Sequence, residues 1–147
     1  MGTFTAKVDE KGRLKLPSAF KEYICGFGSS RVFVTSLDDA TLRLYPITVW
    51  KSNLNFLKSY RKEPRWAEHV ARVANANGQS GEVDEQGRVL LPQEIRRVLG
   101  LENSMVHLEC INNRINILGK EVFERELREA KADIGTKVVE LEREGLE

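Results

Sequence analysis

The sequence repeats itself. Residues 8–17 (VDEKGRLKLP) match residues 83–92 (VDEQGRVLLP) at a constant offset of 75, and seven of the ten pairs are identical. Weaker similarity continues at an offset of 73, between residues 42–45 and 115–118. The change of two residues indicates a shorter loop in the second copy. A half-chain is too short to bury a sufficient core alone, so we expect two interdependent copies of one supersecondary unit.

Each copy shows the same order of predicted elements. A short strand enters a turn, a second strand ends at a proline, a short helix follows, and two more strands show the alternation of a half-buried sheet. The predicted strands are 3–9, 13–16, 31–36 and 41–45 in the first copy, and 80–84, 88–91, 104–110 and 114–118 in the second. Asp38-Asp39 and Asn112-Asn113 are the expected turn residues of the last two strands in each copy.

Apolar residues at helical spacing close each copy with a longer helix. Those of the first copy are Ile47, Trp50, Leu54 and Leu57, and those of the second are Phe123, Leu127, Ala130, Ile134, Val138 and Leu141. A linking segment, about 61–78, contains another short amphipathic helix with Trp66, Val70, Val73 and Ala74. We therefore expect an α+β, mainly β fold of two ββαββα repeats (3–48 and 78–121), a helical connection (49–77) and an amphipathic C-terminal helix (122–147).

The segment with chemical interest is the turn Asp9-Glu-Lys-Gly-Arg13, echoed by Asp84-Glu-Gln-Gly-Arg88. Gly12 and Gly87 supply the positive φ that a hairpin with a G1 bulge needs. The two aspartates can accept hydrogen bonds from turn amides, and the arginines start the returning strands. Either the turn is an ordinary hairpin in which arginine pairs with aspartate, or the arginines face a ligand.

Charge distinguishes the two turns. Residues 7–21 contain five bases and two acids, net +3, whereas residues 82–97 contain three bases and four acids, net −1. Phosphate binding depends on Lys and Arg, and the arginine fork matches guanine. We therefore expect the first turn to make most of a DNA contact through Lys11, Arg13 and Lys15, and the second to be structural or to contribute Arg88 alone.

The overall charge is nearly balanced, at +1 for 147 residues, so the chain is not a general polycation. Residues 121–147 contain nine acids and five bases, net −4, which indicates an acidic helical tail. A second basic cluster is either a solvated helical face or a supplementary phosphate track, and consists of Lys58, Arg61, Lys62, Arg65 and Arg72.

Several function classes find no support in the sequence. No nucleophile, base and orienting partner cluster, and neither a metal-ligand spacing nor a phosphate loop occurs, so we expect no enzyme, metal, cofactor or small-molecule substrate. His69 and His107 are expected to be ordinary helix and strand residues. We expect neither a membrane span nor a signal peptide, and two unpaired cysteines, Cys25 and Cys110.

With these motifs in view, the chain resembles the MraZ family, within the SpoVT–AbrB-like group, over about residues 3–130. The marks of the resemblance are Asp9-x-x-Gly-Arg13 with Leu16-Pro17, Leu44-Tyr45-Pro46 with Trp50, and Asp84-x-x-Gly-Arg88 with Leu91-Pro92. One such motif is weak, but two of them around the Tyr-Pro-x-x-x-Trp element make a specific match.

The resemblance implies a double-split β-barrel and a ring-shaped homo-oligomer in the cytoplasm, on the nucleoid. It further implies regulation of transcription of the division and cell-wall gene cluster, by binding of short direct repeats in double-stranded DNA. The family's proposed DNA-binding motif falls on Asp9 and Arg13, and on Asp84 and Arg88.

Two other classes stay open. An antitoxin uses a related hairpin to bind DNA and a disordered tail to neutralise a toxin, but has one motif copy, whereas this chain has two and a tail with helical spacing. A purely structural ring protein would bind no DNA, and Arg13 would then have no role in binding.

Overall fold

The computed structural model describes residues 2–147 and contains two similar units in sequence. The first consists of β1 (Phe4–Val8), β2 (Arg13–Lys15), α1 (Ser18–Cys25), β3 (Arg31–Ser36), β4 (Leu42–Pro46) and α2 (Ile47–Ser59). The second consists of β5 (Gln79–Glu82), β6 (Arg88–Leu90), α4 (Gln93–Val98), β7 (Ser104–Ile111), β8 (Arg114–Gly119) and α5 (Lys120–Lys131). Helix α3 (Pro64–Asn77) joins them and α6 (Ile134–Glu144) follows. The α+β, mainly β fold with a ββαββα order is confirmed.

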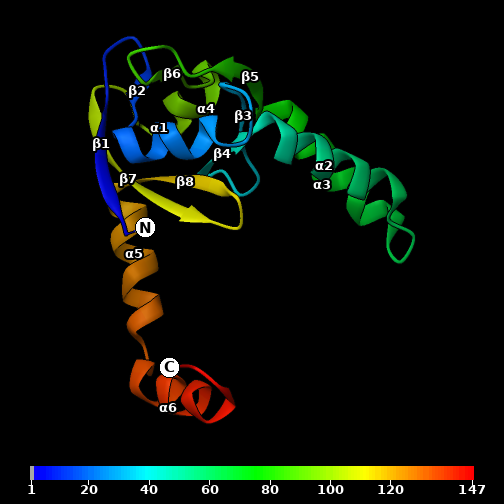
Figure 1. Cartoon of the computed structure of the whole chain (residues 1–147), viewed down its shortest axis with the longest axis vertical. Coiled ribbons are helices and arrows are strands. Elements are labelled where there is room, and N and C mark those ends of the chain that lie inside the picture. The colour runs from blue at the N-terminus through cyan, green and yellow to red at the C-terminus, as the bar shows by residue number, and fades with distance from the viewer. Residues whose placement is uncertain (1) are drawn as a thin grey trace.

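The eight strands form one antiparallel sheet in which the two units interleave. The strand order is β5-β3-β4-β8-β7-β1-β2-β6. The first strand of each unit pairs with the third strand of the other, with Ala6 opposite Val106 and Gly81 opposite Val32. The outermost strands β5 and β6 also pack together, so the sheet is nearly closed into a barrel (Figure 1).

A pseudo-twofold axis relates the two units. In the β2–β6 pair, Leu14 lies opposite its counterpart Val89, while Arg13 lies opposite Leu90 and Lys15 opposite Arg88. Successive side chains of a strand point to opposite faces. Leu14 and Val89 are therefore buried in the barrel. The flanking charged residues, Arg13 and Lys15 of the first unit and Arg88 of the second, face outward on the same side of the ribbon.

The barrel interior is apolar and belongs to both units. Its fully buried large side chains are Val8, Leu14, Phe20, Ile24, Val32, Val34, Leu42, Leu44, Leu91, Leu108, Ile115 and Ile117. Both units thus contribute to one shared core, and neither unit could bury it alone.

Helices α2 and α3 form a hairpin that is anchored to the barrel at one end. Trp50 of α2 stacks on Phe33 of β3 at a centroid distance of 4.5 Å, and Tyr45 packs on the same indole. The buried Thr35 hydroxyl donates a hydrogen bond of 2.7 Å to the carbonyl of Ala74 in α3. Beyond this anchor the hairpin extends away from the barrel (Figure 1).

Two helical expectations need correction. Of the apolar residues expected to make α3 amphipathic, Ala74 is buried, but Trp66, Val70 and Val73 are exposed. The second buried residue is Ala67, because small side chains let α3 approach its neighbours closely. The single C-terminal helix is two helices. The break falls at Asp133, whose φ of 55° is left-handed, and neither this aspartate nor the following Gly135 favours a helix.

Gly78, where α3 meets β5, provides a test of this packing. A Cβ there would lie 2.3 Å from the Phe33 ring and 2.4 Å from the Ala74 carbonyl oxygen, which leaves no room for a methyl group. We predict that Gly78→Ala lowers the free energy of unfolding by about 3 kcal/mol, the upper end for overpacking. Gly81→Ala, on the adjoining strand β5, meets nothing closer than 3.7 Å and is the control. Equal stabilities in urea denaturation would contradict the packing described.

Candidate nucleic-acid interface

The two hairpin turns have the same backbone geometry. In the first, Gly12 N–H donates to the Asp9 carbonyl at 3.0 Å and Asp9 N–H donates to the Arg13 carbonyl at 2.9 Å. The corresponding bonds at Gly87 and Asp84 are 2.9 and 3.0 Å. The glycines have φ values of +83° and +80°, so they have the left-handed conformation expected from the sequence.

The aspartates hold the turns through their carboxylates. Asp9 Oδ1 accepts hydrogen bonds of 2.9 Å from the amides of Lys11 and Arg13, and Asp84 Oδ1 does the same for Gln86 and Arg88. The hydrogen bond from the Arg13 amide lowers the pKa of Asp9, helped by the Arg13 side chain and the Lys11 amide. The pKa of Asp84 is lowered chiefly by the Arg88 amide. Both turns are therefore most ordered when these groups are ionised.

The two arginines differ in what they face. Arg13 Nε lies 2.9 Å from Asp9 Oδ2. In the first copy, therefore, the arginine pairs with the aspartate of its own turn. Its side chain nevertheless remains 41% exposed. The Arg88 side chain instead donates to the Gln86 side-chain oxygen, a neutral acceptor. The positive charge of Arg88 is thus less neutralised than that of Arg13.

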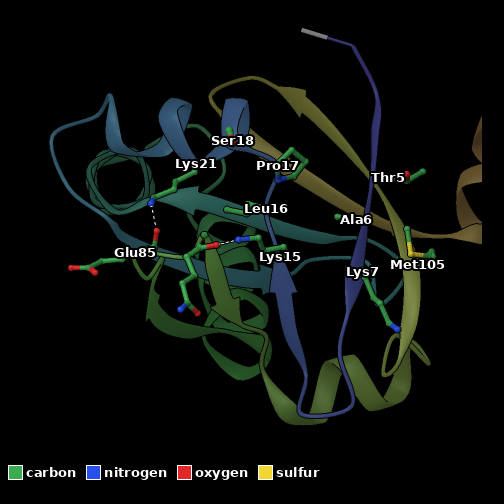
Figure 2. Close-up of a pocket in the computed structure, with 12 residues that line it drawn as sticks. Thr5, Ala6, Lys7, Lys15, Leu16, Pro17, Ser18, Lys21, Glu85 and Met105 are labelled. Carbon is green, nitrogen blue, oxygen red and sulfur yellow. Dashed lines mark hydrogen bonds between the residues drawn. The ribbon is translucent and has the colours of Figure 1, made fainter.

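Lysines of the first copy lie at the turn of the second. Lys15 Nζ donates to the Gln86 carbonyl and Lys21 Nζ donates to the Glu85 carbonyl, as Figure 2 shows. An ammonium group has three donors, so each lysine keeps two after bonding to a neutral carbonyl. Lys7 of β1 lines the same open hollow, which has a volume of about 560 Å³.

The first turn has the corresponding neighbour, Arg96, which the offset of 75 equates with Lys21. Its guanidinium lies directly against Gly12, where a Cβ would come within 2.2 Å of Cζ. Arg96 Nη1 donates to the Leu91 carbonyl at 2.6 Å and Nε pairs with Glu102 at 3.1 Å. This cation is therefore neutralised by a carboxylate, whereas Lys21 contacts a carbonyl.

The tertiary structure redistributes the charge counted along the chain. Within residues 2–147, no carboxylate oxygen lies within 4.0 Å of the side-chain nitrogens of Lys15, Lys21 or Arg88, the cations around the second turn, or of Lys7, which lies across the hollow (Figure 2). At the first turn Lys11 is exposed, and Arg13 is paired. Sequence reasoning missed Lys7, Lys21 and Arg96, although the repeat offset could have matched Lys21 with Arg96.

Other site types find no support in the described part of the chain. Residues 2–147 contain no group of three or more metal-ligating side chains. None of their helices combines the length and apolar character needed to cross a membrane. Cys25 and Cys110 are free thiols. His69 lies exposed on α3, while His107 of β7 stacks on Phe123 of α5 at a centroid distance of 3.9 Å.

Fold and site together define a class: an α+β protein whose interleaved barrel displays paired, charged hairpin turns. No family model matches the chain. It is similar, however, to curated proteins named transcriptional regulator MraZ. Identity is 34% to the protein of Acidobacterium capsulatum, over 86% of each chain, and 35% to that of Thermomicrobium roseum, over 72% of each. It is 33% to that of Desulforamulus reducens, over 90% of this chain and 89% of the relative.

The chain belongs to the MraZ family of transcriptional regulators. The resemblance seen in the sequence is thereby confirmed. Because these relatives are named as regulators, a class without catalytic activity, the expectation that the chain is not an enzyme is confirmed as well.

The lowered pKa of Asp9 predicts how the first turn responds to acid. The folded-state pKa lies below the ordinary value of 3.8, so the carboxylate stabilises the fold fully above that pH and loses this effect as the pH falls through the folded pKa. Asp9→Asn should therefore be less stable than the wild type near neutral pH and approach it below pH 3.8. Thermal unfolding across this range measures the difference, and Glu10→Gln on the same turn is the control. A constant difference at every pH would contradict the role given to the carboxylate.

Proposed function

We propose that the protein is a sequence-specific regulator that binds double-stranded DNA through both hairpin turns and the β2–β6 ribbon between them. The observation that supports this most is a group of cations that have no carboxylate partner among residues 2–147. They are Lys15, Lys21 and Arg88 around the second turn and Lys7 across the hollow beside it. The names of the relatives point to the same class of function.

The ribbon has a geometry suited to a duplex. A two-stranded antiparallel ribbon fits the major groove, where arginine reads guanine edges while lysines contact phosphates. Lys15 and Arg88 are cross-strand partners, and like charges directly opposite each other destabilise a sheet. Phosphate groups would remove that repulsion, so the arrangement favours an anionic partner.

The proposed contacts are Lys11 and Arg13 at the first turn, Arg88, Lys15 and Lys21 at the second, and Lys7 across the hollow beside it. Asp9, Gly12, Asp84 and Gly87 hold the turns in shape rather than contact DNA. Lysines 15 and 21 are held in place by backbone carbonyls before DNA arrives, which reduces the entropy lost on binding.

We further propose the family's biological role for this chain. It regulates the division and cell-wall gene cluster by binding direct repeats upstream, in the cytoplasm and on the nucleoid. One barrel offers few phosphate contacts, so a ring of copies would convert later contacts into intramolecular ones and raise the avidity. Repeats spaced by about one helical turn would match such an array.

Substitutions of the two arginines test the site. Arg13→Ala should abolish specific binding to the DNA upstream of the protein's own gene in a gel-shift assay. Arg88→Ala should weaken specific DNA binding less, because the net charge along the sequence is +3 for residues 7–21 and −1 for residues 82–97. If Arg88→Ala is the more damaging change, the cations gathered at the second turn, rather than the net charge along the sequence, decide the contact. Arg125→Ala on α5 is the control. Undiminished binding by both turn variants would support a structural ring without DNA binding.

Salt dependence tests the lysines. The slope of log K against log salt is about −0.9 per phosphate neutralised. We predict that Lys7→Gln/Lys15→Gln/Lys21→Gln reduces this slope by about three and weakens binding to all duplexes alike. Glutamine keeps a donor for the turn carbonyls while removing the charge.

The matched control, Lys120→Gln/Lys131→Gln/Lys137→Gln, makes the same change of charge at the other end of the molecule. It should leave the slope nearly unchanged. Equal slopes for both triple variants would mean that the protein's overall charge, and not this surface, governs binding.

A further inference from the structure

Two pairs of helices project from the barrel. The α2–α3 hairpin and the α5–α6 arm leave it in different directions (Figure 1). They begin at equivalent positions, since α2 follows β4 in the first unit and α5 follows β8 in the second. The DNA-contacting surface proposed above uses neither pair, so their exposed faces need a separate explanation.

The α2–α3 hairpin exposes an apolar stripe. Trp66, Val70 and Val73 lie on one face of α3 at the spacing of successive helical turns, and Trp66 is 63% exposed. The side of α3 that contributes buried residues is a different one, with Ala67 and Ala74. The stripe is therefore an unpartnered surface rather than part of the hairpin's own core, and a solvent-facing tryptophan beside two valines favours a partner.

The α5–α6 arm also lacks a packing partner, because neither helix has a buried residue. Helix α6 has 11 residues, and isolated helices shorter than about 12–15 residues are marginal in water. Its apolar residues are nevertheless spaced for one face, with Ile134 and Leu141 about half exposed. A helix of this kind requires another surface to pack against.

Charge indicates which surface that is. Residues 47–77, the hairpin, contain six bases and two acids, net +4, whereas residues 120–147, which include the arm, contain nine acids and six bases, net −3. Two copies of the acidic arm would repel each other, as would two copies of the basic hairpin. An arm against a hairpin brings together opposite charges around two apolar stripes, which is the arrangement of a specific interface.

We infer that the α5–α6 arm of one copy docks on the Trp66–Val70–Val73 stripe of the next copy. This contact uses different patches on its two sides, so it is heterologous, and repetition of such a contact closes a ring when the rotation allows. The inference rests on the assembly proposed under the function. It also assigns a role to the basic cluster of the hairpin, including Arg65 and Arg72, which is to attract the acidic arm. Phosphate binding would leave the exposed apolar stripe unexplained.

Two double variants test the contact separately on its two sides. Trp66→Gln/Val70→Gln makes the hairpin stripe polar and leaves the arm unchanged. Ile134→Gln/Leu141→Gln makes the apolar face of the arm polar and leaves the stripe unchanged. Glutamine is a good helix former, and all four side chains are exposed, so each chain should fold. Val98→Gln, at a 71% exposed position on α4, is the control. Masses are measured by light scattering after gel filtration.

We expect the wild type and Val98→Gln to be large assemblies and both double variants to be monomers. Mixing the two double variants should produce a heterodimer of one chain each, because only one intact arm and one intact stripe remain in the pair. Circular dichroism of each variant shows whether its helices persist.

Other outcomes overturn the inference. One is a double variant that keeps the wild-type mass. Another is loss of assembly in the arm variant alone, which would mean that arms pair with arms. The third is a mixture of the two double variants that stays monomeric. A monomeric wild type would overturn the inference and the proposed ring together. Regulation through DNA binding fails by a different result, undiminished binding by the turn variants, so the two failures are distinguishable.

Discussion

Neither unit of this chain can complete its own sheet, because its first strand pairs with the third strand of the other unit. The pairs β1–β7 and β3–β5 are the two halves of this exchange, and β2–β6 and β4–β8 lie on the axis between them. The shared core is buried only when both exchanges are made. Folding of the two units is therefore one event, and the hairpin turns are held rigidly at the surface as a consequence.

The same exchange determines the electrostatics of the turns. Leu16 N–H donates to the Gly87 carbonyl and Leu91 N–H donates to the Gly12 carbonyl, so each turn is tied to the unit that did not form it. Cations of one unit accordingly lie at the turn of the other. The first turn receives Arg96, which Glu102 neutralises, and the second receives Lys21, which no carboxylate neutralises among the described residues. Two turns with nearly identical sequences therefore present different charges to a ligand.

In the proposed function, the helices that follow each unit separate DNA binding from assembly. The turns lie on the barrel, whereas the hairpin and the arm project from it in other directions (Figure 1). A heterologous contact between these projections would set the spacing between neighbouring barrels. Spacing matters because a regulator that reads tandem DNA repeats must present its contacts at the repeat interval.

Much of this architecture could be predicted from the sequence because it depends on local chemistry. The repeat of residues 8–17 defines two equivalent units, the glycines define the turns, and alternation defines the strands. Helix α3 was harder to predict, since its apolar stripe resembles a core face while small alanines make the buried contact. The division of the C-terminal helix depends on one left-handed residue, Asp133.

What the sequence by itself determined is the number of units, their elements, the family resemblance and the residues at the turns. Only the tertiary structure decided which cations surround each turn, because the partner of a strand across a sheet is a long-range choice that local spacing does not encode. Lys15 and Gln86 are 71 positions apart in the chain, yet they are in contact, since antiparallel pairing about the pseudo-twofold axis places each unit's charges beside the other unit's turn.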